Sequence, residues 1–163
     1  MIAGRYIENQ PVSWEQLHKD ARELARRVAV HGPFKGIVAV ARGGLVPAAV
    51  LARELGIRLV HTLCLSSYDW KSPEAGIRCL LKTLEGDGEG WLIVDDLVDT
   101  GRTAMEVRGM YPRGLFVTLY AKPEGRPHVD ICISEVGQDT WILLPWDSQL
   151  DFVSPIIESA SQK

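Results

Sequence analysis

The hydrophobic and polar positions along the chain follow two patterns. Short apolar runs, each ending at glycine or polar residues, are typical of strands buried on both faces of a parallel sheet. Between them, apolar residues recur three and four positions apart, as in amphipathic helices. The runs predict strands over residues 36–41, 57–66, 79–84, 115–121 and 129–136, one beginning at Leu92, and a final one in 140–147. The pattern therefore favours an α/β fold.

Two helices are predicted in the first half of the chain. Ser13 is typical of a helix N-cap, with Gln16 as its capping-box partner, and helical spacing then continues to about Val30. The second helix covers residues 45–55, with Pro47 in its first turn and Gly56 as its stop. Residues 1–12 and 148–163 have no pattern that assigns them to an element.

The stretch 92–103 carries the strongest chemical signal. An apolar run leads to two adjacent carboxylates, Asp95 and Asp96, which we expect where the strand ends, and a helix is predicted from about residue 104 to 111. Between them lies a polar turn. Because the first N–H groups of a helix lack internal partners and its dipole is positive there, a loop before a helix favours a phosphate. The turn consists of Asp99, Thr100, Gly101, Arg102 and Thr103.

Two carboxylates beside a phosphate need an explanation, since the charges repel. A bridging divalent cation is one, and hydrogen bonds from the vicinal hydroxyls of a ribose are another. A ligand with a ribose, a 5′-phosphate and a magnesium-bound diphosphate would use both. In the alternative interpretation, Asp95 and Asp96 only end a strand and Asp99 caps the following helix.

A second strand, loop and helix carries the opposite charge. The strand over 36–41 ends at Arg42, Gly43 and Gly44, and the predicted helix follows. Arg42 with the glycine N–H groups would bind an anion from the other side of the site. The alternative is a glycine-rich turn with a surface arginine.

Three further features lie near expected strand ends. Residues 69–78 are polar and aperiodic, which suits either a lid that excludes water or a plain surface loop. Lys122 follows a predicted strand, where an open α/β sheet builds its site, so it is either a donor to a 6-oxo group or a solvated lysine. Trp141 offers a flat face for stacking a base, and Ile142 and Asp147 offer backbone groups; the alternative is that the tryptophan is a core residue.

Composition excludes several classes of protein. The chain has 163 residues, is 46% hydrophobic and has a net charge of -3, which suits one domain, residues 1–163, and gives no basic field for nucleic acid. The three cysteines lack the spacing of a zinc site and indicate reduced thiols. We find no run long enough to span a bilayer and no signal peptide, and we expect a cytoplasmic protein.

The string Val-Asp-Asp-Leu-Val-Asp-Thr-Gly resembles the phosphoribosyl-diphosphate motif of type I phosphoribosyltransferases, and Ala-Arg-Gly-Gly, Ala-Lys-Pro-Glu-Gly-Arg-Pro and Gln-Asp-Thr-Trp-Ile extend the likeness to the bacterial purine enzymes. The resemblance implies a mainly parallel sheet flanked by helices, with a small hood from the C-terminal part. In the family, the loop after the first strand often contains a non-proline cis peptide; many relatives begin this loop with serine, where this chain has Ala41.

The resemblance also implies roles for individual residues. Arg42 and Gly43 would bind diphosphate, together with a basic residue of the loop 69–78, for which Arg78 is preferred to Lys71. Asp96 would bind Mg²⁺, Asp95 the ribose, and residues 99–103 the 5′-phosphate. Asp99 would be the general base near the purine N7. The purine would contact Asp99, Lys122, Trp141, Ile142 and Asp147.

The implied reaction is transfer of phosphoribose from phosphoribosyl diphosphate to guanine, xanthine and, less well, hypoxanthine, with Mg²⁺ required. The implied assembly is a homotetramer, loosely associated with the inner face of the cytoplasmic membrane. Two other functions stay open: a salvage enzyme for another base, such as hypoxanthine or adenine, and a phosphoribosyl-diphosphate sensor that regulates through nucleic acid. The mildly acidic composition disfavours the sensor, and we expect no nucleic-acid partner.

Overall fold

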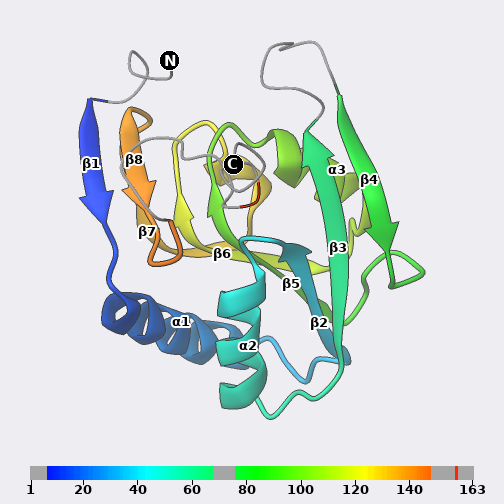
Figure 1. The fold of residues 1–163 in the computed structure, drawn as a ribbon. Coiled ribbons are helices and arrows are strands. Elements are labelled where there is room, and N and C mark those ends of the chain that lie inside the picture. Colours follow the sequence, from blue (N-terminus) through cyan, green and yellow to red (C-terminus); the bar gives the residue numbers. More distant parts are fainter. Residues whose placement is uncertain (1–6, 68–75, 148–156, 158–163) are drawn as a thin grey trace.

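A computed structural model describes residues 7–67, 76–147 and 157 of the chain (Figure 1). In this part of the chain, a six-stranded sheet has the order β4-β3-β2-β5-β6-β7, and every strand pair is parallel except β3–β4 at one edge. The elements in chain order are β1 (Glu8–Pro11), α1 (Trp14–Ala29), β2 (Gly36–Ala41), α2 (Leu45–Glu54), β3 (Val60–Ser67), β4 (Ile77–Lys82), β5 (Trp91–Val98), α3 (Arg102–Met110), β6 (Leu115–Ala121), the short 3₁₀ turn η1 (Arg126–His128), β7 (Ile131–Glu135) and β8 (Thr140–Leu143).

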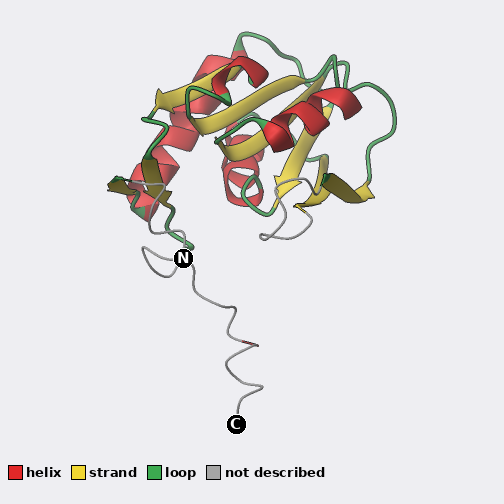
Figure 2. Cartoon of the chain, turned by 90° about the horizontal axis from the view of Figure 1, so that it is seen from above, coloured by secondary structure: helices red, strands yellow, loops and turns green. Residues whose placement is uncertain are grey.

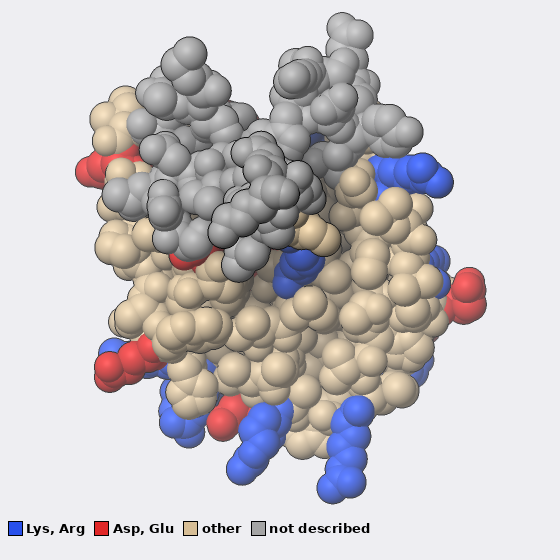
Figure 3. Space-filling view, in the orientation of Figure 1, with Lys and Arg blue, Asp and Glu red and all other residues tan. Residues whose placement is uncertain are grey.

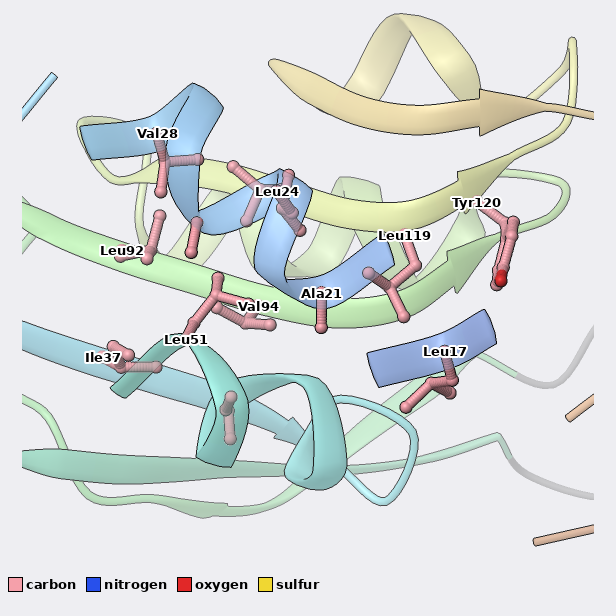
Figure 4. Packing of buried hydrophobic residues seen from close by; sticks show 14 of the residues in the cluster. Leu17, Ala21, Leu24, Val28, Ile37, Leu51, Leu92, Val94, Leu119 and Tyr120 are labelled. Atoms are coloured by element: carbon pink, nitrogen blue, oxygen red, sulfur yellow. The ribbon is translucent and has the colours of Figure 1, made fainter. Parts of the chain in front are cut away.

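Helices cover both faces of the sheet, as Figure 2 shows. Successive residues of β2 point to opposite faces: Ile37 belongs to the core beneath α1 and α2, and Val38 to the core beneath α3. Figure 4 shows the first of these cores, in which Leu17 and Leu24 of α1 are fully buried. Truncating such a leucine to alanine typically costs about 2–5 kcal/mol, so these contacts hold the sheet that positions the site.

The order in which successive strands are added to the sheet reverses between β2 and β5. The connection after β2 runs through α2 to β3 on one side, and the connection after β5 runs through α3 to β6 on the other. The two connections pass over opposite faces, since α2 packs in one core and α3 in the other. Open α/β sheets bind their ligands at such a switch point, outside the carboxyl ends of the strands.

The N-terminal helix begins as the sequence predicts. The backbone N–H of Gln16 donates to Ser13 Oγ at 3.1 Å, so Ser13 is the N-cap. The capping box is only half formed, because the Gln16 side chain donates to Asp20 Oδ1 at 2.7 Å. Asp20 also accepts from the Tyr120 hydroxyl at 2.8 Å, and this buried hydrogen bond joins α1 to β6. Within the described residues no helix is long and apolar enough to cross a membrane.

A separate two-stranded parallel sheet, which we call the hood, consists of β1 and β8 (Figure 1). Glu8 pairs with Thr140 and Asn9 with Trp141. The hood thus contains the predicted C-terminal strand together with an N-terminal strand from residues that the sequence pattern left unassigned. The N-terminal segment thereby fixes the strand that carries Trp141 and Ile142.

Several predicted boundaries are wrong by a few residues. The third strand begins at Val60 and not at residue 57, because the N–H of Ile57 donates to Ala52 O and closes the end of α2. The strand predicted to end at Asp95 continues to Val98, so both carboxylates lie within β5. Residues 85–90 join the edge strand β4 to the central strand β5, which are not neighbours in the sheet.

Two shorter corrections concern the flanking strands. The fourth strand spans Ile77–Lys82 and not residues 79–84, so the last two residues of the predicted loop 69–78 belong to a strand. Residues 69–75, most of the loop that suits either a lid or a plain surface loop, lie outside the described residues. The seventh strand is Ile131–Glu135, shorter than the predicted 129–136.

Candidate active site

A cleft of about 320 Å³ opens at the switch point. Two segments form most of its wall: residues 41–44, which we call the β2 loop, and residues 95–103, which we call the β5 segment. Every residue predicted to bind phosphoribosyl diphosphate lies in the wall except Arg78. Nine residues of these two segments were predicted to bind the donor, and all nine line the cleft: Arg42, Gly43, Asp95, Asp96, Asp99, Thr100, Gly101, Arg102 and Thr103.

The β2 loop is a tight turn between strand and helix. The peptide bond between Ala41 and Arg42 is cis, as expected from the family. The N–H of Gly44 donates to Val40 O at 2.8 Å. A Cβ added at Gly43 would overlap the carboxyl group of Asp96. Only glycine at this position therefore lets the β2 loop approach the β5 segment so closely.

Each of the two adjacent carboxylates accepts a hydrogen bond from the backbone N–H of the residue that follows it. Asp95 Oδ1 accepts from the N–H of Asp96 at 2.9 Å, and Asp96 Oδ1 accepts from the N–H of Leu97 at 2.6 Å. Burial raises the pKa of Asp95 well above its usual value, and the neighbouring charge of Asp96 adds to the effect. Burial also raises the pKa of Asp96. The pair is thus an electrostatically unfavourable arrangement that a bound cation or a hydroxyl donor would relieve.

Residues 99–103 lead from β5 into α3 as the sequence predicts. Gly101 has φ +83°, in the left-handed region that favours glycine, and it is the N-cap of α3. The alternative in which Asp99 caps this helix is wrong, because the N-cap residue of α3 is Gly101. The start of the helix therefore lines the cleft with the backbone N–H groups of its first turn, which is the arrangement that binds a phosphate.

Lys122 lies directly after β6 and is 1% exposed. Its N–H donates to Val98 O at 2.9 Å, and its Nζ lies 3.3 Å from Asp99 Oδ1. The alternative of a solvated lysine is therefore wrong. The pairing joins the ends of β5 and β6 and places an ammonium donor beside the candidate general base.

The hood carries the other residues predicted to bind a purine. Trp141 is half-buried and Ile142 is buried, both in β8. Asp147 follows β8, and its Oδ2 accepts from the N–H of Leu144 at 3.0 Å. The charge of Asp147 makes a small contribution to the raised pKa of Asp96.

Arg78 does not join the other predicted residues. It lies on β4, is exposed, and stands opposite Ser66 of β3, outside the wall of the cleft. Its role toward diphosphate stays a prediction, together with the part of the loop 69–78 that lies outside the described residues.

The sequence analysis missed one polar residue at the site. Gln138, in the turn between β7 and β8, donates from Nε2 to Asp99 Oδ1 at 2.9 Å. Gln138 is the first residue of the string Gln-Asp-Thr-Trp-Ile, but neither that string nor its spacing predicts a contact with Asp99. Only the pairing of distant strands brings it to the end of β5.

The site suits Mg²⁺ in the manner that is common for phosphate substrates. Asp95 and Asp96 offer hard oxygen ligands whose charges repel each other. Among the described residues no group of three or more His, Cys, Asp or Glu side chains could hold a metal. Mg²⁺ usually binds through one or two carboxylates, with water and substrate phosphates as its other ligands.

Two acidic residues in a strand, the start of a helix and a glycine-rich basic loop opposite them are groups that suit a phosphorylated sugar. The chain belongs to the family of proteins with a phosphoribosyl transferase domain, whose family model matches residues 13–152. Its fold is the type I phosphoribosyltransferase fold, with a mixed, mostly parallel sheet flanked by helices.

Several curated relatives of this chain share one name, xanthine-guanine phosphoribosyltransferase. The chain is 59% identical over 160 residues to xanthine-guanine phosphoribosyltransferase of Nitratidesulfovibrio vulgaris strain DP4, covering 98% of both chains. It is 54% identical over 156 residues to the enzyme of the same name from Desulfotalea psychrophila strain LSv54, covering 96% of this chain and 97% of that one. A purine phosphoribosyltransferase from Pyrococcus horikoshii shares the fold, with a TM-score of 0.73 and 24% identity over 91% of this chain and 100% of that chain.

Proposed function

We propose that this protein is a purine-salvage enzyme that transfers phosphoribose from phosphoribosyl diphosphate to N9 of guanine or xanthine, and less well to hypoxanthine. The products are GMP or XMP and diphosphate. Relatives named xanthine-guanine phosphoribosyltransferase, at 50–59% identity over nearly the full length, support the reaction. The proposal treats residues 1–163 as a single phosphoribosyltransferase domain.

The observation that carries the choice of base is the contact between Lys122 Nζ and Asp99 Oδ1, at 3.3 Å. A 6-oxopurine presents O6 and N7 side by side on one edge. Lys122 only donates, so it suits O6, and the Asp99 carboxylate accepts, so it suits a protonated N7. An adenine amino group would face the ammonium donor-to-donor, and such buried mismatches reject a substrate strongly.

In the proposed reaction, N9 forms a bond to the anomeric carbon of the ribose as the bond from that carbon to diphosphate breaks. The purine N7 loses its proton to the carboxylate of Asp99, which is therefore the catalytic base. Trp141 stacks on the base, while Ile142 and Asp147 contact its edge from the hood. Stacking and edge contacts hold N9 in line with the sugar, which reduces the entropy cost of the reaction.

The donor would lie along the cleft. Arg42 and Gly43 of the β2 loop bind diphosphate, and Arg78 is the proposed further contact. The 5′-phosphate lies in the β5 segment at Asp99, Thr100, Gly101, Arg102 and Thr103. Asp95 accepts from the ribose hydroxyls, and Asp96 holds Mg²⁺. When bound, Mg²⁺ would offset the charge of the leaving diphosphate.

The direct test incubates the protein with Mg²⁺, phosphoribosyl diphosphate and one purine at a time: guanine, xanthine, hypoxanthine or adenine. Nucleotide formation is followed by absorbance and chromatography. We expect GMP and XMP, less IMP and no AMP. Formation of AMP alone would contradict the proposal, and binding of the donor with no nucleotide formed would favour the sensor. Against the sensor, the basic side chains along the lower edge of the face shown in Figure 3 are interspersed with acidic ones.

We also propose a homotetramer in the cytoplasm, loosely associated with the inner face of the cytoplasmic membrane. Exposed apolar side chains near the β3–β4 edge support an assembly: Leu59 is 51% exposed and Leu80 is 59% exposed. Light scattering during size-exclusion chromatography measures the mass of the assembly, which should be four times that of one chain. Co-sedimentation with lipid vesicles tests membrane association.

A further inference from the structure

Gln138 connects three segments that are far apart in the sequence. It lies in the tight turn between β7 and β8, in which the N–H of Thr140 donates to Gly137 O at 3.1 Å. Its Nε2 donates to Asp99 Oδ1 at 2.9 Å, and its Oε1 accepts from the N–H of Glu124 at 3.1 Å. One side chain thus joins the β5 segment, the turn after β6 and the turn that leads into β8.

The orientation of this amide follows from its partners. A backbone N–H can only donate, so the Glu124 side must face the amide oxygen. A carboxylate can only accept, so the Asp99 side must face the amide nitrogen. Both ends of the amide are satisfied in one orientation only, and the reverse would place like groups against each other at both ends. The contact to Asp99 is also charge-assisted, which makes it stronger than a neutral hydrogen bond.

Two donors converge on the same atom of Asp99. Gln138 Nε2 lies 2.9 Å and Lys122 Nζ 3.3 Å from Oδ1. Two contacts from different directions on one oxygen fix the rotation of the carboxyl group, as groups that orient a catalytic base do. Lys122 comes from β6 and Gln138 from the turn before β8, so the orientation depends on both elements.

We propose that Gln138 is a positioning residue for the reaction: its amide N–H₂ orients the carboxylate of Asp99 and couples it to the strand that carries the purine-binding residues. This inference rests on the proposed function, because it assigns Asp99 as the base. In the proposed bound state Lys122 is directed to the purine O6, and the hydrogen bond from Gln138 still holds the carboxylate of Asp99 in its orientation. Trp141 and Ile142 follow Gln138 within four residues. The same turn therefore fixes both the position of the Trp141 ring and the orientation of the Asp99 carboxylate.

Two substitutions separate the two ends of the amide. Gln138→Glu keeps the shape and the oxygen that accepts from Glu124, but places an oxygen against Asp99. Gln138→Met removes both hydrogen bonds without adding a charge. If Gln138 orients Asp99, kcat with guanine falls about 10-fold or more in Gln138→Met and further in Gln138→Glu, because a lost hydrogen bond to a charged group is typically that large and repulsion adds to it. KM for phosphoribosyl diphosphate stays within about 2-fold, because its 5′-phosphate binds backbone N–H groups of the β5 segment, whereas Gln138 contacts the side chain of Asp99.

A purely structural role gives the opposite order. If the contact to Glu124 is what matters, Gln138→Glu retains most of the wild-type kcat and Gln138→Met loses more. Gln10→Glu is the matched control: it adds the same charge at an exposed position of β1 in the hood, and its kinetics should equal those of wild type. Thermal unfolding of each variant separates misfolding from loss of positioning.

The outcomes distinguish the two levels of the proposal. Absence of guanine-dependent nucleotide formation by the wild-type protein overturns the proposed function itself. An active wild type with Gln138→Glu at or above Gln138→Met in kcat, or with kcat unchanged in both, overturns only the role of Gln138. If Gln138→Met does not fold, the comparison of Gln138→Glu with Gln10→Glu still decides, because equal kcat values contradict the inference.

Discussion

The β2 loop and the β5 segment are two versions of the same construction with opposite chemistry. Each leads from the carboxyl end of a central parallel strand into a helix, and the two strands, β2 and β5, are neighbours. The β2 loop carries Arg42 and two glycines, whereas the β5 segment carries Asp95 and Asp96 before its turn. The helix after the β2 loop packs on one face of the sheet and the helix after the β5 segment on the other.

The difference teaches how one cleft holds a ligand with both anionic and hydroxyl groups. Backbone N–H groups and a cation suit phosphate oxygens, and carboxylates suit hydroxyls or a metal ion. The segments approach so closely that Gly43 leaves no room for a Cβ beside Asp96. The basic β2 loop and the acidic β5 segment therefore lie close together in one cleft. Substitutions in the two segments should have different effects on turnover and on donor binding.

The largest effect should come from Asp96→Asn, which keeps the size of the side chain and removes its charge. If Asp96 holds Mg²⁺, turnover should fall at least about 100-fold, because a catalytic metal contributes several kcal/mol. Initial rates at several Mg²⁺ concentrations measure the effect. Near-normal turnover with unchanged Mg²⁺ dependence would remove this role for Asp96.

A second substitution, outside both segments, separates binding of the base from binding of the donor. Lys122→Ala should lower kcat/KM for guanine by about 10–100-fold, since a buried charge-assisted contact to O6 is lost. Binding of phosphoribosyl diphosphate, measured by calorimetry, should stay largely intact. Unchanged guanine kinetics would refute the assignment of Lys122 to the purine.

Gly43→Ala should break the close approach of the two segments. The added methyl group overlaps the Asp96 carboxyl group, so one segment must shift, and we expect turnover to fall about 10-fold or more because misplacement near 1 Å is costly. Gly109→Ala in α3 is the matched control, because its Cβ meets nothing within 4 Å. Wild-type turnover in Gly43→Ala would show that the close approach has no role.

The smallest effect should be a gain in stability. Asn in Asp95→Asn still accepts from the N–H of Asp96 through Oδ1, but it has no charge to bury. We expect the ligand-free variant to gain about 1 kcal/mol, or about 2–4 °C in Tm, near neutral pH. The Asp95→Asn variant should also bind phosphoribosyl diphosphate much more weakly. A gain in stability together with a loss of binding would show that Asp95 serves function and not stability.

The pH dependence of that gain follows from the raised pKa of Asp95. Between its ordinary value of 3.8 and its higher folded value, the folded state binds more protons than the unfolded state, so wild-type stability falls as pH rises through that window. The advantage of the variant should therefore be complete above the window and absent below pH 3.8. An equal Tm difference at all pH values would contradict burial of a charged Asp95.

Local patterns in the sequence were enough to predict most of the main sheet. Continuous apolar runs such as the one at Leu92 belong to central strands because both faces are buried, and Ser13 set the start of α1. β1 could not be predicted, because its four residues are all exposed and its partner strand lies more than a hundred residues away. Pairing over that distance leaves no local pattern.

The predicted site shows the same limit. The acidic pair and the turn at Gly101 are contiguous in the chain, so their motif could be read directly. The placement of Lys122 at the site could be predicted from the position of a strand end, whereas its ion pair with Asp99 was not predicted. Gln138 could not be found, because its two partners belong to other strand ends and a turn glutamine is usually solvated. Arg78 lies in β4 because that strand begins two residues earlier than its apolar pattern indicates.

The central claim is that the β5 segment holds the sugar and the 5′-phosphate of phosphoribosyl diphosphate. Isothermal titration of the protein with that donor, with and without Mg²⁺, tests it most directly when wild type is compared with a variant carrying both Asp95→Asn and Asp96→Asn. The account predicts binding by wild type that is strengthened by Mg²⁺ and a much weaker, Mg²⁺-independent signal from the variant. Equal affinities for the two proteins, or no binding by wild type, would contradict it.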